Sequence, residues 1–225
     1  MFDTFKADLK AAMENDPAAK SKAEIIFTYG GFRALQCYRR AHWLYNHKMH
    51  FWAYRITARA RRWYGVDIHP AAKIGKGVFI DHGVGLVIGE TTEIGNNVTI
   101  YQGVTLGGTG KDIGKRHPTI GNNVMISAGA KVLGPVVIGD NTKIGAGSVV
   151  LKNVPSHCTV VGVPGRVVRM HGEKYKDLDQ KLPDPVLDEF VRINERLKQI
   201  EKELNIKNKS CTELVEQQNI NKEEE

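Results

Sequence analysis

The sequence has few cysteines and no long hydrophobic run, and both absences restrict what the protein can be. Its three cysteines, Cys37, Cys158 and Cys211, lie far apart and form no CxxC pair. This predicts a reducing compartment rather than a disulfide framework. No apolar stretch approaches the roughly 18 residues of a membrane-spanning helix. The segment 1–10 is polar and charged, without the apolar core of a signal peptide. We therefore expect a cytoplasmic protein that does not enter a membrane.

Signatures of nucleic-acid binding are also missing, although the chain is basic. The net charge of +7 at pH 7 would suit nucleic acid, an anionic membrane or a phosphate-bearing small molecule. No zinc-finger spacing or aromatic-flanked nucleic-acid module accompanies the arginines. The remaining interpretations are solvated or intersubunit faces and the attraction of an anionic small ligand, and no nucleic-acid partner is predicted.

Glycine, in contrast, is abundant, and most of the 23 glycines fall between residues 65 and 172. In the same stretch aliphatic residues recur mostly every six positions. They are Ile68, Ile74, Ile80, Ile88, Ile94, Ile100, Leu106, Ile120, Ile126, Val132, Ile138, Ile144 and Val150. A period of six fits neither an amphipathic helix nor a hairpin sheet, but it is typical of short parallel strands joined by tight turns. The pattern predicts a mainly β fold, a parallel β-helix of hexapeptide repeats.

Three regions follow from these patterns: a helical N-terminal domain at 1–65, the β-helix at 66–170, and a C-terminal helix with a polar tail at 171–225. Helix-like runs in the first region lie near 2–14, 21–46 and 49–64. In the last region, apolar residues are spaced alternately by four and three positions: Val186, Phe190, Ile193, Leu197, Ile200 and Leu204. This spacing leaves two arrangements open, a helix packed on its own β-helix or a coiled coil around a threefold axis.

The repeat is interrupted twice, and each interruption contains a histidine. The step from Ile80 to Ile88 includes His82, and the longer step from Leu106 to Ile120 includes His117. Insertions in a solenoid form surface loops, which commonly carry function. Because imidazole titrates near neutral pH, it can take a proton from an alcohol. We therefore predict that both histidines belong to an active site.

A general base needs a partner on its second ring nitrogen, usually a carboxylate. Asp67 precedes His82 by about one turn of a three-sided coil and is therefore expected beside it. Asp81 is adjacent in sequence, and neighbouring strand residues point to opposite faces. This favours Asp67 as the partner of His82 and leaves Asp81 for another role or for a turn. The planar guanidinium of Arg116 is well matched to a carboxylate.

A metal site would be the competing use of these histidines and acids. No Cys/His cluster exists, and no third histidine stands at a matching position of the repeat, so no metal is predicted. His69, inside the repeat next to Ile68, stays ambiguous. The glycine-rich stretch 107–110 is able to present backbone N–H groups to an anion or a carbonyl oxygen.

Several of these segments together resemble the serine O-acetyltransferases, a family of hexapeptide-repeat acyltransferases. The resemblance covers about residues 8–168 and rests on Asp67–Gly75, Asp81–His82, Val104–Lys111, Arg116–Pro118, Lys143–Val150 and Gly162–Pro164. Hexapeptide repeats occur in many acyltransferases, but the combination of two histidine-bearing loops is specific. The resemblance implies a left-handed parallel β-helix and a trimer with active sites between neighbouring subunits. It also implies direct transfer of acetyl from acetyl-CoA to the serine hydroxyl, the first step of cysteine biosynthesis from serine.

The resemblance further implies roles for the candidate catalytic residues. His82 is similar to the general base of the family, oriented by Asp67, and His117 to a second histidine that helps to position serine. The positions that would lie along acetyl-CoA are Gly108, Ala128 and Ala146.

The residues that the resemblance implies for substrate binding suit a zwitterionic amino acid. Arg116 would bind the serine carboxylate, and Asp16 and Asp81 would hold its ammonium group. Cysteine is implied as an inhibitor that occupies the same site.

Both ends of the chain depart from the enteric members of that family. The helical N-terminal region is shorter than the domain that pairs two trimers there, so a single homotrimer is expected rather than a hexamer. O-acetylserine sulfhydrylase stays a candidate partner, but the C-terminal isoleucine that docks into it is absent here, with Ile220 nearby. The alternatives are an O-acetyltransferase acting on a sugar or an antibiotic, a metal-dependent solenoid enzyme, and a non-catalytic trimeric scaffold.

Overall fold

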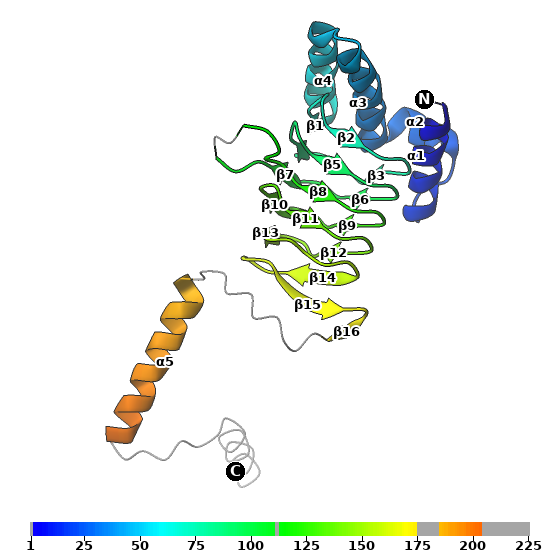
Figure 1. The fold of residues 1–225 in the computed structure, drawn as a ribbon. Helices are drawn as coiled ribbons and strands as arrows, with labels where there is room; N and C mark the ends of the chain where they lie inside the picture. The colour runs from blue at the N-terminus through cyan, green and yellow to red at the C-terminus, as the bar shows by residue number, and fades with distance from the viewer. Residues whose placement is uncertain (1, 111–112, 175–184, 204–225) are drawn as a thin grey trace. The chain divides into compact units, whose positions relative to one another are not determined.

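The computed structural model describes residues 2–110, 113–174 and 185–203. The chain divides into two compact units, 1–180 and 181–225, and each is described by itself. The first unit holds four helices followed by a β-helix (Figure 1). The segments around Cys211 and Ile220, and the polar C-terminal tail, lie outside the described residues.

Four helices precede the β-helix: α1 (Phe2–Asn15), α2 (Lys22–Thr28), α3 (Gly30–Asn46) and α4 (His50–Tyr64). The helix-like runs predicted near 2–14 and 49–64 are confirmed. The run near 21–46 is divided in two, because Tyr29 takes an extended conformation with ψ of 107° between α2 and α3. Ser21 caps α2 by accepting a hydrogen bond from the Glu24 N–H, and Gly65 ends α4 with a left-handed φ of 66°.

Thirteen short strands form the coils of the β-helix: β1 (Asp67–Ile68), β2 (Lys73–Ile74), β3 (Phe79–Ile80), β4 (Val87–Ile88), β5 (Glu93–Ile94), β6 (Thr99–Ile100), β7 (Thr105–Gly107), β8 (Thr119–Ile120), β9 (Met125–Ile126), β10 (Lys131–Leu133), β11 (Val137–Ile138), β12 (Lys143–Ile144) and β13 (Val149–Val150). At the far end stand β14 (Cys158–Val161), β15 (Arg166–Met170) and β16 (Glu173–Lys174).

The strands assemble into three sheets, one for each side of the coil. The first sheet has the order β1-β4-β7-β10-β13, the second β11-β8-β5-β2, and the third β16-β15-β14-β12-β9-β6-β3. Pairing is parallel throughout the coils and continues from β12 to β14, and among the described strands only the β14–β15 and β15–β16 pairs are antiparallel. The chain thus winds as a left-handed parallel β-helix, as predicted.

The hexapeptide residues sit in register along the core. Each is the second residue of its strand, and all except the partly buried Ile74 are buried. In the first sheet, for example, Ile68 pairs with Ile88, and Ile88 pairs with Leu106. The period of six therefore places one inward side chain on each side of each coil, which is the pattern that the sequence predicts.

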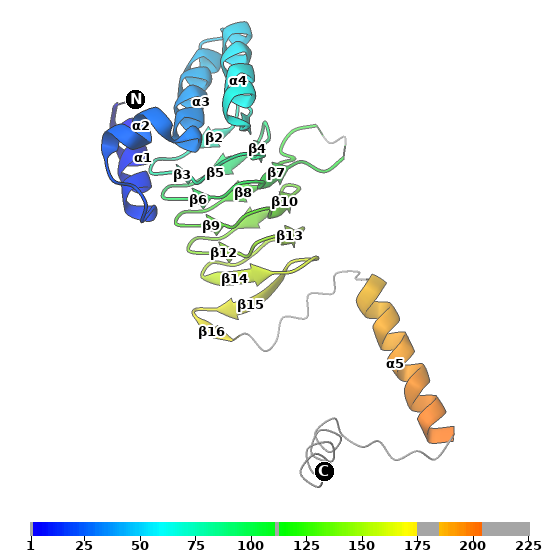
Figure 2. The ribbon, with the colours of Figure 1, turned by 180° about the vertical axis from the view of Figure 1, so that it is seen from behind.

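Both interruptions of the repeat flank the first sheet. Residues 81–86 form the corner between β3 of the third sheet and β4 of the first. Residues 108–118 connect β7 of the first sheet to β8 of the second. Figures 1 and 2 show α1 and α2 beside β3, and the segment that follows β7 on the opposite side of the β-helix. The two predicted histidine loops of one chain are therefore separated by a sheet.

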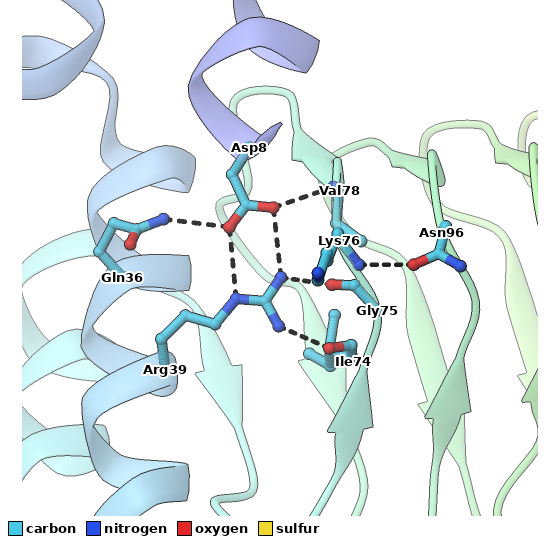
Figure 3. A network of polar contacts seen from close by, with 8 residues as sticks. All are labelled: Asp8, Gln36, Arg39, Ile74, Gly75, Lys76, Val78 and Asn96. Carbon is cyan, nitrogen blue, oxygen red and sulfur yellow. Dashed lines mark hydrogen bonds and ion pairs between the residues drawn. The ribbon is translucent and has the colours of Figure 1, made fainter. Parts of the chain in front are cut away.

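A buried ion pair attaches the helices to the first coil (Figure 3). Asp8 on α1 is fully buried, and its Oδ1 lies 3.2 Å from Nη2 of Arg39 on α3. The same carboxylate accepts the Val78 N–H, and Arg39 donates to the carbonyl oxygens of Ile74 and Gly75. Burial raises the pKa of Asp8, and the Arg39 guanidinium opposes that rise. The network fixes α1, and thus the segment after it, against the coil that carries β3.

The second unit contains α5 (Pro185–Glu203), which confirms the predicted C-terminal helix. Ile193, Leu197 and Ile200 each expose close to half of their surface. The choice between a packed helix and a coiled coil stays a prediction, and the side chains at the heptad positions Val186, Phe190 and Leu204 lie outside the described residues. Within the described parts, none of the helices is long and apolar enough to cross a membrane.

Candidate active site

The first predicted histidine lies in a hollow of about 460 Å³ at the corner between β3 and β4, which we call the His82 hollow. Asp16, Tyr29, Asp81 and His82 line it together with neighbouring residues. His82 adopts a left-handed φ of 57°, and three quarters of its side chain is exposed. Its Nε2 lies 3.8 Å from Oδ1 of Asp81, which is too long for a hydrogen bond. The imidazole is thus accessible and stands beside a carboxylate.

Asp16 brings a second carboxylate into the His82 hollow. It follows α1 directly and accepts hydrogen bonds from the Tyr29 hydroxyl at 2.6 Å and from the Ala18 N–H at 2.8 Å. The bond from Tyr29 is the main reason that the pKa of Asp16 is lowered, and the same bond raises the pKa of Tyr29 to about 12. Asp16 is therefore ionised at neutral pH, so that two acids are available for a cationic group.

The second predicted histidine lies in another hollow, of about 490 Å³, on the outer face of the first sheet. We call it the His117 hollow. Asp67, His69, Glu90, Arg116 and His117 line it, and α4 forms its wall with Arg61 and Tyr54. Nη2 of Arg116 lies 3.1 Å from Oε2 of Glu90, and both side chains are partly exposed. The guanidinium is thus held at the hollow while part of it is open to a ligand.

His117 is far less accessible than His82, with 8% of its surface exposed. Its Nδ1 lies 2.9 Å from Oγ1 of Thr91 and 3.2 Å from the Thr91 backbone nitrogen. Burial is the main cause that lowers the pKa of His117, and the neighbouring Arg116 lowers it further. The two histidines consequently have different environments, one exposed beside an acid and one buried beside a cation.

Within one chain Asp67 does not lie beside His82, although its position in the repeat predicts this. Oδ2 of Asp67 lies 3.1 Å from Nη1 of Arg61 in the His117 hollow, whereas His82 faces Asp81 in the other hollow. The alternation rule for strands does not apply to the Asp81–His82 pair, because His82 follows β3 in a left-handed turn. Adjacent residues therefore line the same hollow.

The positions predicted for acetyl-CoA lie along two different edges of the β-helix. Ala128 and Ala146 lie at corners between the third and first sheets, each before a left-handed glycine, and the Gly147 N–H donates to the Ala128 carbonyl at 2.9 Å. Gly108 lies at the other corner, where an added Cβ would come within 3.2 Å of Nε2 of His117. Small residues leave the backbone accessible at both places.

The sequence pattern does not single out Tyr29, Glu90 or Arg61 as residues of the two hollows, nor Thr91, which contacts the His117 ring. Tyr29 was hidden inside a helix-like run, and Glu90 and Thr91 lie in an ordinary turn of the repeat, where the pattern carries no special signal. His69, left ambiguous by the sequence, lines the His117 hollow, and burial lowers its pKa. In the ranges that the structure describes, no three His, Cys, Asp or Glu side chains are grouped to hold a metal ion.

Comparison with known proteins identifies the family. Residues 1–37 match the family "Serine acetyltransferase, N-terminal", and residues 117–152 match "Bacterial transferase hexapeptide (six repeats)". The serine acetyltransferase of Bacillus licheniformis is 55% identical over 205 residues, which is 90% of this chain and 95% of the relative.

Solved structures agree with this assignment. The serine acetyltransferase of Neisseria gonorrhoeae in complex with serine is 48% identical, with a TM-score of 0.73 over 75% of this chain and 69% of that one. The serine acetyltransferase of Brucella abortus in complex with coenzyme A is 45% identical, with a TM-score of 0.74 over 78% and 69%. On this evidence of sequence and structure, the chain belongs to the serine acetyltransferase family.

Proposed function

We propose that this chain transfers the acetyl group of acetyl-CoA to the hydroxyl of L-serine, giving O-acetyl-L-serine and CoA. The observation that carries the proposal is the complementary chemistry of the two hollows. One presents two carboxylates and an exposed imidazole. The other presents the guanidinium of Arg116, which is partly open beside Glu90, and the buried imidazole of His117. A zwitterionic amino acid with a hydroxyl group needs this set. The relatives named above, solved with serine and with coenzyme A, support the same substrates.

The active site is completed between two subunits of a homotrimer. Within one chain the first sheet separates His82 from Arg116 and His117, so a single serine cannot use both hollows of the same chain. In a closed threefold assembly, one corner of each subunit faces a different corner of the next. The His82 hollow of one subunit then meets the His117 hollow of its neighbour. This arrangement also brings Asp67 of the neighbouring subunit to His82, as its orienting carboxylate.

Serine binds across this interface through its two charges. Asp16 and Asp81 hold the ammonium group, and Arg116 holds the carboxylate by a planar, charge-assisted contact. The Tyr29 hydrogen bond keeps Asp16 ionised for this purpose. Holding both ends of the amino acid directs its hydroxyl to the imidazole between them, which lowers the entropic cost of reaction.

The chemical step is a direct acyl transfer with His82 as general base. Nε2 of His82 takes the proton of the serine hydroxyl as the oxygen attacks the thioester carbonyl carbon. The tetrahedral intermediate collapses with loss of the CoA thiolate, which takes the proton back from His82. One C–O bond forms, one C–S bond breaks, and no electrons leave the system. Acetyl-CoA lies along the corner with Ala128 and Ala146, and Gly108 of the neighbouring subunit lies opposite. A cytoplasmic location suits this use of acetyl-CoA.

The first test follows release of the CoA thiol with L-serine, with sugars and chloramphenicol as control acceptors. Serine-dependent release that is lost in His82→Ala supports the proposal. Release only with a sugar or drug would keep the fold and reject the substrate. Absence of release with every acceptor would reject the acetyltransferase activity.

A second test addresses the shared site by mixing two inactive variants. His82→Ala chains and Arg116→Ala/His117→Ala chains each lack one half of every site. If the halves come from different subunits, random 1:1 mixed trimers regain about a quarter of the intact sites. If both halves come from one chain, mixing restores nothing.

A further inference from the structure

A hydrogen bond from Thr91 determines which ring nitrogen of His117 carries the proton. The Thr91 backbone N–H points at Nδ1 of His117 over 3.2 Å. A backbone amide can only donate a hydrogen bond, so Nδ1 must accept and cannot itself carry a proton. A neutral imidazole with a free Nδ1 carries its single hydrogen on Nε2. The tautomer is therefore set by the backbone.

The hydroxyl of Thr91 strengthens the same assignment. Its Oγ1 accepts the backbone N–H groups of Arg116 and His117, both at 3.1 Å. These two bonds use the acceptor capacity of the oxygen, so its own hydrogen is directed outward. Nδ1 of His117 lies 2.9 Å away and receives it. The Thr91 side chain thus fixes both the backbone at Arg116 and His117 and the His117 ring.

Two glycines leave the space that the His117 ring occupies. A Cβ added to Gly89 would lie 2.0 Å from Cδ2 and 2.1 Å from Nε2 of His117, so the ring packs directly on the backbone there. A Cβ on Gly108 would come within 3.2 Å of the same Nε2. A ring turned over would place a carbon against the Thr91 N–H and lose both hydrogen bonds. Only the Nε2 edge remains for a bound substrate.

Most of the charges around His117 also disfavour its protonation. The nearby cations Arg116 and Lys115, and the His69 ring, disfavour a second proton on His117, whereas the Glu90 carboxylate favours one. Burial is the largest of these influences and also disfavours the charged ring. A second proton would have to enter at Nδ1, directly opposite the Thr91 N–H. Protonation would therefore break the contacts that hold the ring.

We propose that Thr91 is a positioning residue that holds His117 as the neutral Nε2–H tautomer, so that His117 donates a hydrogen bond to the substrate and does not act as a base. His82, which has no such contact to a backbone amide in the described residues, is then the sole base of the pair. The acceptor is a substrate oxygen that carries negative charge in the His117 hollow. The identity of that substrate as serine with acetyl-CoA rests on the proposed function.

The test of the tautomer needs no substrate. We would record ¹⁵N spectra of the full-length protein labelled at histidine, and assign the His117 signals by their loss in His117→Gln. We expect an unprotonated Nδ1 and a protonated Nε2 from about pH 6 to pH 8. A proton on Nδ1, or a normal titration of His117 in this range, would overturn the proposal even in an active enzyme. Failure of serine acetylation with this spectrum intact would instead reject the proposed function alone.

Two pairs of variants test the role of the contact. Thr91→Ser keeps the hydroxyl and should leave the spectrum and the serine kcat/KM within about twofold of wild type, whereas Thr91→Val should lower kcat/KM by about tenfold or more. His117→Gln keeps an N–H donor near the Nε2 position and should retain at least about tenfold more activity than His117→Ala. For His82 the glutamine and alanine variants should be equally inactive. Thr91→Val keeps the backbone N–H and should therefore keep the tautomer. Equal losses in His117→Gln and His117→Ala, or a wild-type kcat/KM in Thr91→Val, would contradict the proposal.

Discussion

The hydroxyl of Tyr29 donates a hydrogen bond of 2.6 Å to Oδ2 of Asp16, joining the turn before α3 to the segment after α1. Because this bond is the main cause of the lowered pKa of Asp16, Tyr29→Phe should raise that pKa. A carboxyl with a depressed pKa is fully ionised at neutral pH and becomes protonated only as the pH falls. We therefore expect the variant to bind serine nearly normally above pH 7 and to lose serine affinity at a higher pH than wild type does on acidification.

The measurement is the serine KM of wild type and Tyr29→Phe between about pH 5 and pH 8. Asp16→Asn serves as the control, since it lacks the carboxylate at every pH and should show a raised KM without the acid-dependent change. An identical pH dependence of KM in wild type and Tyr29→Phe would show that the hydrogen bond does not tune serine binding.

Substitutions in the two hollows should affect different kinetic parameters, kcat in the His82 hollow and the serine KM in the His117 hollow. His82→Asn removes the proposed base and should lower kcat by about 10²- to 10⁴-fold with a small change in the serine KM. Arg116→Ala removes the proposed carboxylate ligand and should mainly raise the serine KM, with Arg116→Lys intermediate because it keeps the charge without the planar fork. Steady-state kinetics at saturating acetyl-CoA provides both parameters. Equal effects of His82→Asn and Arg116→Ala on kcat and KM would contradict this division of roles.

The buried pair of Asp8 and Arg39 makes a prediction about stability. Arg39→Met leaves the fully buried Asp8 carboxylate without its cation and should destabilise the first unit by about 3–5 kcal/mol. Lys73→Met is the matched control, because the Lys73–Glu93 pair is exposed and should contribute less than about 1 kcal/mol. Denaturant unfolding monitored by circular dichroism compares the two. Similar midpoints for both variants would show that the Asp8 network does not anchor the helices.

More of the fold than of the site could be predicted from the sequence, because the fold follows a regular repeat and the site does not. The inward positions of the β-helix repeat at a fixed period, so Ile88 and Leu106 could be placed in register from the sequence alone. The neighbours of His82 depend instead on a left-handed turn and on how α1 docks through Asp8, which no period reveals. Likewise, the contact between Thr91 and His117 joins residues 26 positions apart through hydrogen bonds to single atoms.

Cysteine should inhibit by occupying the serine site, because it carries the same ammonium and carboxylate groups and differs only at the thiol. We expect inhibition competitive with serine, and a parallel loss of affinity for serine and cysteine in Arg116→Ala, since both use the same guanidinium. Cysteamine lacks the carboxylate and 3-mercaptopropionate lacks the ammonium group, so neither should inhibit at concentrations where cysteine does. Initial rates at several serine concentrations measure all three compounds. Unchanged rates at cysteine levels comparable with serine would refute the prediction. Equal inhibition by all three thiols would instead indicate a reaction at the thiol group, because recognition by Asp16, Asp81 and Arg116 requires both charges.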